Sequence, residues 1–179
     1  MKKILFFTGN RAEFGLQVPL IDEIKNSNDF KYGIIVSGSH LDISYGKTIS
    51  EINNKNYSII GKIKLNPNQN IDYTPKNISL IISKITPILK KFNPDVFIAF
   101  ADRFETFAAT IAASMMNICI AHVEGGDITN GGTFDDNIRH CITKLSHVHF
   151  ASTLDAKKII LRLGEESHRV FNVGFTGLD

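Results

Sequence analysis

Three carboxylates in the second half of the sequence stand where they could act on a bound ligand. Asp102 directly follows the apolar run Val96–Ala101, Glu124 follows the apolar run Ile118–Val123, and Asp135 comes eleven positions after Glu124. Carboxylates that are crowded together raise one another's pKa values, which helps one of them to hold a proton. Such a group could transfer protons to and from a ligand.

Glu124 has the most specific local context of the three. It lies between a buried strand and the pair Gly125-Gly126, where a carboxylate is costly to place unless it is used. The glycines indicate close backbone approach to a ligand or unusual backbone angles. For Asp102 a helix N-cap is an alternative role, and it is compatible with function because caps at this position line the ligand crevice.

Asp135 and Asp136 open a predicted helix, where acidic residues are favourable in any case. Arg139 lies four residues after Asp135 on the same helix face, so a local salt bridge between them is one interpretation. His140 follows directly. For Asp135 the helix N-terminus is an explanation almost as good as a role in chemistry.

Two basic side chains follow the first strands of the chain. Arg11, in the turn after the first strand, could bind phosphate or carboxylate through its guanidinium group, although an ordinary strand-to-helix turn is the alternative. His40 ends the run Ser37-Gly38-Ser39-His40 and could donate a hydrogen bond. A solvated loop explains His40 at least as well.

The elements that must position these residues alternate along the chain. Short runs rich in Ile, Val and Phe are typical of strands that are buried on both faces, and the segments between them have helical periodicity. Strand and helix in succession predict right-handed crossovers and a parallel sheet. The predicted strands are Ile4–Phe7, Tyr32–Ser37, Tyr57–Ile63, Val96–Phe100, Ile118–Val123, Val148–Ala151 and Val170–Val173, and the predicted helices are Gln17–Ser27, Ile78–Phe92, Arg103–Met116, Asp136–Ser146 and Leu154–Leu163.

The sequence therefore predicts an α/β fold: a Rossmann-like parallel sheet of seven strands with helices on both faces. Residues 1–179 are expected to form a single domain. The polar segment Asn66–Asn77 is predicted to be a mobile loop within it. Loops at the carboxyl ends of parallel strands meet at one crevice, which is where Asp102 and Glu124 are expected to lie.

Composition argues against several classes of function. The net charge of +2 gives no electrostatic reason to expect nucleic acid or a membrane as partner. Cys119 and Cys141 are expected to stay reduced, and the pair His147 and His149 lacks the neighbours that a metal site needs. The start of the chain has no secretory signal and no run is long enough to span a bilayer, so a cytoplasmic protein is expected.

Several motifs, matched in order over nearly the whole chain, closely resemble the hydrolysing UDP-N-acetylglucosamine 2-epimerases. Matching together, they are far more specific than any one alone. They are Thr8–Gly15, Asp102–Thr106, Ala121–Asp127, Asp135–His140, Thr143–Phe150 and Asn172–Asp179.

The resemblance implies a two-domain, glycosyltransferase-B-like architecture with the active site between the domains. The chain resembles only the N-terminal domain, so the C-terminal domain is expected to be missing and the isolated half to have little activity. The implied reaction converts UDP-N-acetylglucosamine and water to N-acetylmannosamine and UDP in sialic acid-type biosynthesis, without a metal or other cofactor. UDP is eliminated to give a glycal, to which water then adds.

Carried over by motif, Asp102, Glu124 and Asp135 match the essential acidic residues of that family, and Arg11, Arg139 and His140 match its basic residues. Related enzymes often form dimers, so a homodimer is possible. Two positions depart from the pattern: Leu16, where some members have lysine, and Ala101, where glycine is usual. The first leaves the exact 2-acetamido sugar open, and the second is expected to matter little.

Two alternatives remain. A non-hydrolysing epimerase or a glycosyltransferase would share the fold, although the glycine pair after Glu124 and the run Ile138-Arg139-His140 favour the hydrolysing branch. A truncated domain that binds a ligand without turnover is the other alternative. The sequence does not decide whether UDP or GDP carries the sugar.

Overall fold

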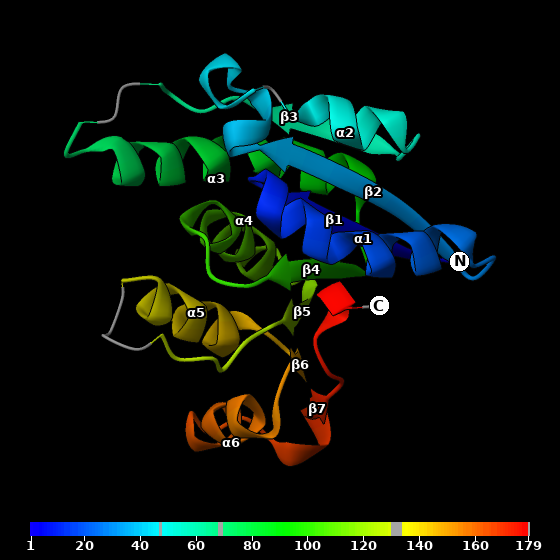
Figure 1. The fold of residues 1–179 in the computed structure, drawn as a ribbon, viewed down its shortest axis with the longest axis vertical. Coiled ribbons are helices and arrows are strands. Elements are labelled where there is room, and N and C mark those ends of the chain that lie inside the picture. The colour runs from blue at the N-terminus through cyan, green and yellow to red at the C-terminus, as the bar shows by residue number, and fades with distance from the viewer. Residues whose placement is uncertain (47, 68–69, 130–133, 179) are drawn as a thin grey trace.

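The fold is a single parallel β-sheet with helices packed on both faces (Figure 1), as the sequence predicted. The computed structural model describes residues 1–46, 48–67, 70–129 and 134–178. The strand order is β3-β2-β1-β4-β5-β6-β7. The strands are β1 (Lys2–Thr8), β2 (Phe30–Ser37), β3 (Ile59–Ile63), β4 (Val96–Phe100), β5 (Cys119–Val123), β6 (Val148–Ala151) and β7 (Val170–Asn172).

The central strands form because their side chains are apolar on both faces. Leu5, Phe6 and Phe7 of β1 have no exposed surface, and neither do Ile34 and Ile35 of β2. Burial of such side chains is the main favourable term in folding, at roughly 25 cal/mol per Å² of apolar surface. All seven predicted strands are present, with β3 two residues shorter at its start than predicted.

Helices cover the sheet in two groups. Side chains of α3, α4 and α5 build one core on one face, and those of α1 and α2 build a second core on the other. None of the helices in the described part of the chain is long and apolar enough to cross a membrane. The helices are α1 (Arg11–Asn26), α2 (Ile49–Asn54), α3 (Tyr73–Phe92), α4 (Phe104–Met115), α5 (Phe134–Leu145) and α6 (Leu154–Arg162).

The segment Asn66–Asn77 differs from the predicted mobile loop, because α3 already begins at Tyr73. The Asn77 side chain is fully buried and accepts a hydrogen bond from the Asn66 backbone N–H at 2.9 Å, so it fastens the start of the segment to the helix. Residues 68–69, within this segment, lie outside the described part. Helix α2 was not predicted, because it is only six residues long.

The strand order reverses between β1 and β4, which are neighbours in the sheet although two strands separate them in sequence. In open α/β sheets, ligands bind beyond the carboxyl ends of the strands at such a switch point. The turns after β1 and β4 contain Asn10 and Asp102, so the fold brings these two regions together at the crevice.

Gly126 packs tightly between the end of β5 and helix α6. Its φ is +86°, and a Cβ atom there would lie 2.3 Å from the Ala156 carbonyl oxygen. Gly15 in α1 differs, because a Cβ atom there would meet nothing within 4 Å. Both positions can be tested with the same substitution.

We expect Gly126→Ala to lower the free energy of unfolding by about 3 kcal/mol, from backbone strain and overlap with Ala156. Gly15→Ala should raise it by up to about 1 kcal/mol, because alanine favours a helix. Urea unfolding followed by circular dichroism measures both. Equal stability of the two variants would contradict the packing described for Gly126.

Candidate active site

Arg139 of α5 joins the loops that follow β4 and β5. Its guanidinium forms ion pairs with Asp102 through Nη2 and with Asp136 through Nη1, the latter at 2.9 Å. Nη1 also donates a hydrogen bond to the Asp127 carbonyl oxygen at 2.6 Å. The predicted salt bridge between Arg139 and Asp135 is therefore wrong. Arg139 pairs instead with Asp136, three residues before it, and with Asp102, which is distant in the sequence.

Asp136 has a larger part in the site than its interpretation as a helix N-terminal acid suggested. Its buried carboxylate accepts hydrogen bonds from the Thr129 backbone N–H and, at 3.0 Å, from the Thr129 hydroxyl group. The pair thus fixes the last described residue before α5. The spacing Asp136-x-x-Arg139 was the signal in the sequence, since residues three apart are neighbours on a helix.

Glu124 is held in an unusual backbone conformation at the end of β5. Its φ is +61°, and its N–H donates to the Phe150 carbonyl oxygen at 3.0 Å. The residue is only 8% exposed, and Oε1 has no hydrogen-bond partner among the described residues. Burial, followed by the charges of Asp127 and Asp102, raises the pKa of Glu124 to about 7.

Asp102 and Asp135 are linked electrostatically. Burial raises the pKa of Asp102, the Arg139 guanidinium opposes that rise, and the charge of Asp135 adds to it. Asp135 itself is exposed. The three predicted carboxylates thus form a chain of mutually repelling charges, in which Asp102 influences Glu124 and Asp135 influences Asp102.

His122, in β5, forms hydrogen bonds that connect the loop after β4 to helix α5. The fully buried ring contacts the Ala101 carbonyl oxygen at 2.9 Å through Nε2 and the Thr143 hydroxyl at 3.1 Å through Nδ1. Burial lowers the pKa of His122 to about 3, so the ring is neutral at physiological pH. Gly125 packs against it, since a Cβ atom there would lie 2.7 Å from Nδ1.

Among the described residues, neither of the two basic side chains predicted after the first strands belongs to the lining of the cavity at the carboxyl ends of β1 to β4. His40 is fully buried, with Nε2 3.0 Å from the Thr8 hydroxyl and Nδ1 2.8 Å from the Thr48 hydroxyl, so the solvated-loop interpretation is wrong. Burial lowers its pKa to about 4. Arg11 is largely exposed and forms an ion pair with Glu51 at 2.9 Å.

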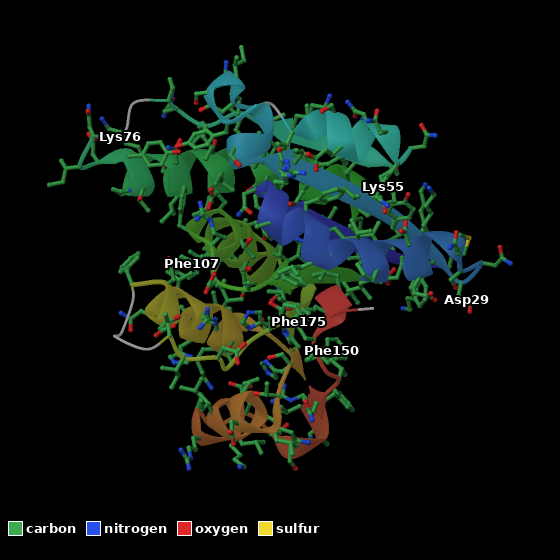
Figure 2. The ribbon with its side chains drawn as sticks, in the orientation of Figure 1. Asp29, Lys55, Lys76, Phe107, Phe150 and Phe175 are labelled. Carbon is green, nitrogen blue, oxygen red and sulfur yellow. The ribbon has the colours of Figure 1, made fainter. Side chains whose placement is uncertain are left out.

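His140 is the next residue of α5 after Arg139. It lines a shallow groove between α4 and α5 together with Phe107, which Figure 2 labels beside these helices. Its Nδ1 atom is buried without a hydrogen-bond partner among the described residues. Residues 130–133, which precede α5 in the sequence, lie outside the described part.

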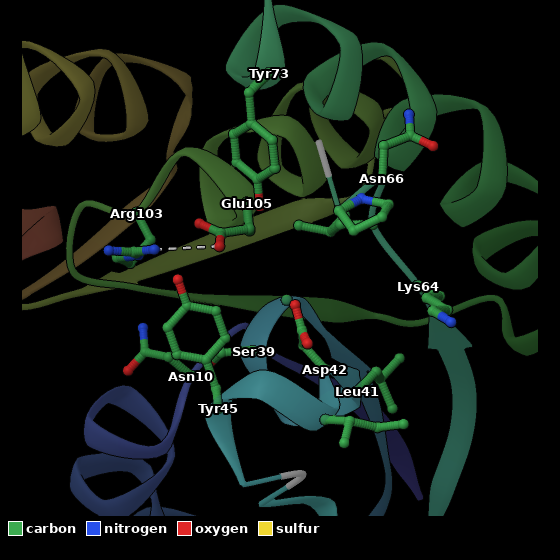
Figure 3. Close-up of a pocket in the computed structure, with 14 residues that line it drawn as sticks. Asn10, Ser39, Leu41, Asp42, Tyr45, Lys64, Asn66, Tyr73, Arg103 and Glu105 are labelled. Carbon is green, nitrogen blue, oxygen red and sulfur yellow. Dashed lines mark hydrogen bonds and ion pairs between the residues drawn. The ribbon is translucent and has the colours of Figure 1, made fainter. Parts of the chain in front are cut away.

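Beside the carboxylates, a cavity of about 490 Å³ opens at the carboxyl ends of β1 to β4 (Figure 3). The sequence did not reveal it, because its lining comes from five separate segments. None of the three predicted carboxylates lines it, but Arg103 and Glu105, which follow Asp102 directly, do. The other polar side chains of the lining belong to Asn10, Ser39, Asp42, Tyr45, Lys64, Asn66 and Tyr73.

Glu13 is a further buried acid that the sequence did not single out. Its carboxylate accepts hydrogen bonds from the Gly9 N–H and the Thr106 hydroxyl, both at 2.8 Å, and so joins the turn after β1 to helix α4. Burial raises its pKa from 4.5 to about 7. Within the described part of the chain, no group of three or more His, Cys, Asp or Glu side chains could hold a metal ion.

Comparison with known proteins identifies relatives of this arrangement. Residues 22–179 match the family model described as UDP-N-acetylglucosamine 2-epimerase. The hydrolysing UDP-N,N'-diacetylbacillosamine 2-epimerase of Legionella pneumophila is 38% identical over all of this chain and 47% of its own length. The crystal structure of the Neisseria meningitidis UDP-GlcNAc 2-epimerase bound to UDP-GlcNAc has a TM-score of 0.86 at 26% identity, covering 99% of this chain and 47% of that one.

A more distant structure, MurG of Acinetobacter baumannii, has a TM-score of 0.61 at 9% identity over 87% of this chain and 42% of that one, which shows a shared fold alone. The seven-stranded parallel sheet with an acidic switch-point crevice is one half of a glycosyltransferase-B-type fold. The chain belongs to the UDP-N-acetylglucosamine 2-epimerase family. It spans about half the length of the curated relatives that it matches.

The raised pKa of Glu13 makes stability depend on pH. The unfolded chain ionises Glu13 near pH 4.5 and the folded chain only near pH 7, so its contribution to stability is present below pH 4.5 and is lost as pH rises through about 7. Glu13→Gln does not titrate and can keep both partners, because its amide oxygen can accept from the Gly9 N–H and its amide N–H can donate to the Thr106 hydroxyl oxygen. Between pH 5 and pH 8 we expect the wild-type chain to lose about 2 kcal/mol more unfolding free energy than this variant.

Urea unfolding at both pH values measures this difference. Glu124 also has a raised pKa and is present in both proteins, so its effect cancels in the comparison. Glu23→Gln, the same change at an exposed position of α1, is the control and should behave like wild type. A wild-type chain and a Glu13→Gln variant with the same pH dependence would show that Glu13 ionises normally.

Proposed function

We propose that this chain supplies the acid–base half of a hydrolysing 2-epimerase, which converts a UDP-linked 2-acetamido sugar and water to the free 2-epimeric sugar and UDP. The Legionella pneumophila relative is a hydrolysing UDP-N,N'-diacetylbacillosamine 2-epimerase, and the Neisseria meningitidis structure, which has the same fold, contains bound UDP-GlcNAc. The observation that carries the proposal is Glu124, a buried carboxylate with a pKa of about 7 whose Oε1 has no hydrogen-bond donor among the described residues.

Glu124 suits the first step of this reaction. A base removes the proton from C2 of the sugar, the C1–O bond breaks, its electron pair leaves with UDP, and a C1–C2 double bond forms. A carboxylate with a pKa near the working pH is a stronger base than an ordinary one and is still ionised in a large fraction of molecules. Its place among Asp127 and Asp102 keeps this pKa high.

Asp102 and Asp135 are then available to transfer protons in the second step and to stabilise the positive charge that develops near C1. Water adds its hydroxyl group to C1, and a proton is delivered to C2 from the face opposite to the one that lost it. Arg139 fixes Asp102 in position, whereas Asp135 stands at the exposed start of α5. We propose Arg11, His40, Gly125, Gly126, Arg139 and His140 as the residues that bind the substrate or shape its site.

The chain matches about half the length of its relatives. We therefore propose that the active-site cleft has a second side, which a further domain forms. In this proposal residues 1–179 contribute the carboxylates and a further domain contributes most contacts to the uridine diphosphate. We also propose a cytoplasmic location for the reaction. Residues 1–179 alone are expected to show little or no turnover.

To test this, the second half of a hydrolysing relative is fused to the C-terminus of this chain. The products that the fusion forms from UDP-N-acetylglucosamine and from UDP-N,N'-diacetylbacillosamine are then measured. Free sugar and UDP support the proposal, and an intact epimerised nucleotide sugar would identify a non-hydrolysing epimerase instead. Asp102→Asn, Glu124→Gln and Asp135→Asn should each lower kcat by about 10²-fold or more.

The pH profile tests the role of Glu124 separately. The rate should rise with pH and level off above about 7, because the ionised carboxylate is the active form. Glu166→Gln, the same kind of change at a largely exposed residue, is the control and should leave the profile unchanged. A Glu124→Gln variant with near-normal turnover would remove Glu124 from the mechanism.

A further inference from the structure

The ring of His122 contacts the backbone beside both Asp102 and Glu124. It has no exposed surface, and its Nε2 lies 2.9 Å from the Ala101 carbonyl oxygen, in the peptide bond that leads into Asp102. At another edge of the ring, a Cβ atom at Gly125, the residue after Glu124, would lie 2.7 Å from Nδ1. One buried side chain thus touches the residue before one candidate acid and the residue after the other.

The peptide bond between Ala101 and Asp102 needs such a contact, because Ala101 has an unfavourable conformation. Its φ of +55° lies in the left-handed region, which residues other than glycine seldom adopt. The Ala101 N–H donates to the Val123 carbonyl oxygen at 2.9 Å, and the Ala101 carbonyl oxygen accepts from His122. Strand β5 therefore holds both peptide groups of Ala101, and the ring fixes the direction in which the chain enters Asp102.

The hydrogen-bond partners of the ring assign its hydrogen. A carbonyl oxygen only accepts, so Nε2 carries the hydrogen in the contact with Ala101. Burial lowers the pKa of His122 to about 3, so the ring is neutral near pH 7 and carries no second hydrogen. Its Nδ1 atom therefore has a free lone pair and accepts a hydrogen bond.

Thr143 supplies that hydrogen bond and connects the ring to helix α5. Its hydroxyl oxygen lies 3.1 Å from His122 Nδ1 and 3.0 Å from the carbonyl oxygen of Arg139, one turn earlier in the helix. A hydroxyl group has a single hydrogen to donate. The Arg139 carbonyl is within a helix, where backbone N–H groups are donors, whereas Nδ1 has no other donor among the described residues. We therefore assign the Thr143 hydrogen to the ring.

The loop after β4 and helix α5 are thus joined at two depths. At the rim, Arg139 forms its ion pair with Asp102, where the two side chains are 11% and 19% exposed. In the interior, the His122 ring lies between the Ala101 carbonyl and Thr143. A single ion pair leaves rotation about the point of contact possible, and the buried ring removes this freedom.

We propose that His122 is a positioning residue, whose ring, with its hydrogen on Nε2 and Nδ1 bound by Thr143, sets the separation of Asp102 and Glu124. This inference rests on the proposed function, in which the two carboxylates act on one sugar. The ring is fully buried, so it acts through the backbone and not by contact with the substrate. A displacement of a reacting group by about 1 Å can lower a rate about 100-fold, so such a spacer is sufficient to control kcat.

Two matched pairs of variants test this in the fusion with the second half of a hydrolysing relative. His122→Gln keeps an N–H donor for Ala101, whereas His122→Leu fills a similar volume without one. Thr143→Ser keeps the hydroxyl group, and Thr143→Val removes it. We expect His122→Leu to lower kcat about 100-fold and Thr143→Val about tenfold, with KM changed by less than about threefold. Both conservative variants should stay within about fivefold of the wild-type kcat.

A change in the core distant from this ring separates positioning from stability. Ile85→Val, in the fully buried core beneath α3, also lowers stability but should leave kcat per folded molecule unchanged. Circular dichroism gives the folded fraction by which each rate is divided. A purely structural role of His122 predicts the behaviour of Ile85→Val for His122→Leu as well.

A second measurement needs no turnover and uses the 179-residue chain. Titration of the Glu124 carboxyl group by ¹³C NMR gives its pKa, which burial and the charges of Asp127 and Asp102 raise from 4.5 to about 7. His122→Leu should move this pKa toward 4.5 because the carboxylates separate and gain water, whereas His122→Gln and Ile85→Val should leave it unchanged. The ¹⁵N shifts of the wild-type ring should show hydrogen on Nε2 and none on Nδ1.

A normal kcat per folded molecule in His122→Leu, an unchanged pKa of Glu124 in that variant, or a ring hydrogen on Nδ1 would each overturn the inference. If His122→Leu does not fold, the Thr143 pair decides, because equal results for Thr143→Val and Thr143→Ser in both measurements contradict positioning through the ring. Failure of the proposed function is distinct, since the wild-type fusion would then release no free sugar. The titration of Glu124 would still decide whether His122 fixes the site.

Discussion

The ion pairs of Arg139 are the constraint on which the rest of the site depends. One guanidinium connects Asp102 after β4, the Asp127 carbonyl after β5, and Asp136 at the start of α5. Buried charges are expensive to remove from water, and a buried ion pair adds little net stability over an apolar contact. Here the network instead fixes geometry, because Arg139 can contact all three partners only when the loops after β4 and β5 and helix α5 are in this one arrangement.

Around this network the backbone carries conformations that are unfavourable in isolation. Ala101 has a φ of +55° and Glu124 a φ of +61°, so both residues are in the left-handed region. Ala101 precedes the candidate catalytic residue Asp102, and Glu124 is itself a candidate. Such a residue costs of order 1–3 kcal/mol, which the surrounding structure must offset. Sheet-edge hydrogen bonds to Val123 and Phe150, and the His122 ring beneath Ala101, hold the two residues there. The departure from glycine at position 101 thus falls on a strained position.

Much of this could be predicted from the sequence, because strands buried on both faces leave a strong apolar pattern. The seven strands, the helices on both faces and the rim positions of Asp102 and Glu124 follow from that pattern and from parallel topology. Contacts between segments distant in sequence could not be predicted. The pairing of Arg139 with Asp102, 37 residues apart, and the burial of His40 between Thr8 and Thr48 depend on how loops close over the sheet.

The charges of the crevice bear on which part of a nucleotide sugar this chain would contact in the proposed function. Arg11, Arg103 and Arg139 are each paired with a carboxylate: Glu51, Glu105, and Asp102 with Asp136, respectively. Glu124 and Asp135 add negative charge at the same edge, while burial keeps His40 and His122 neutral. A diphosphate would meet repulsion here unless other cations neutralised it. In the proposed function, the acidic wall would suit a sugar ring that loses and regains a proton, and the diphosphate would fit better on the opposite wall of a two-domain cleft.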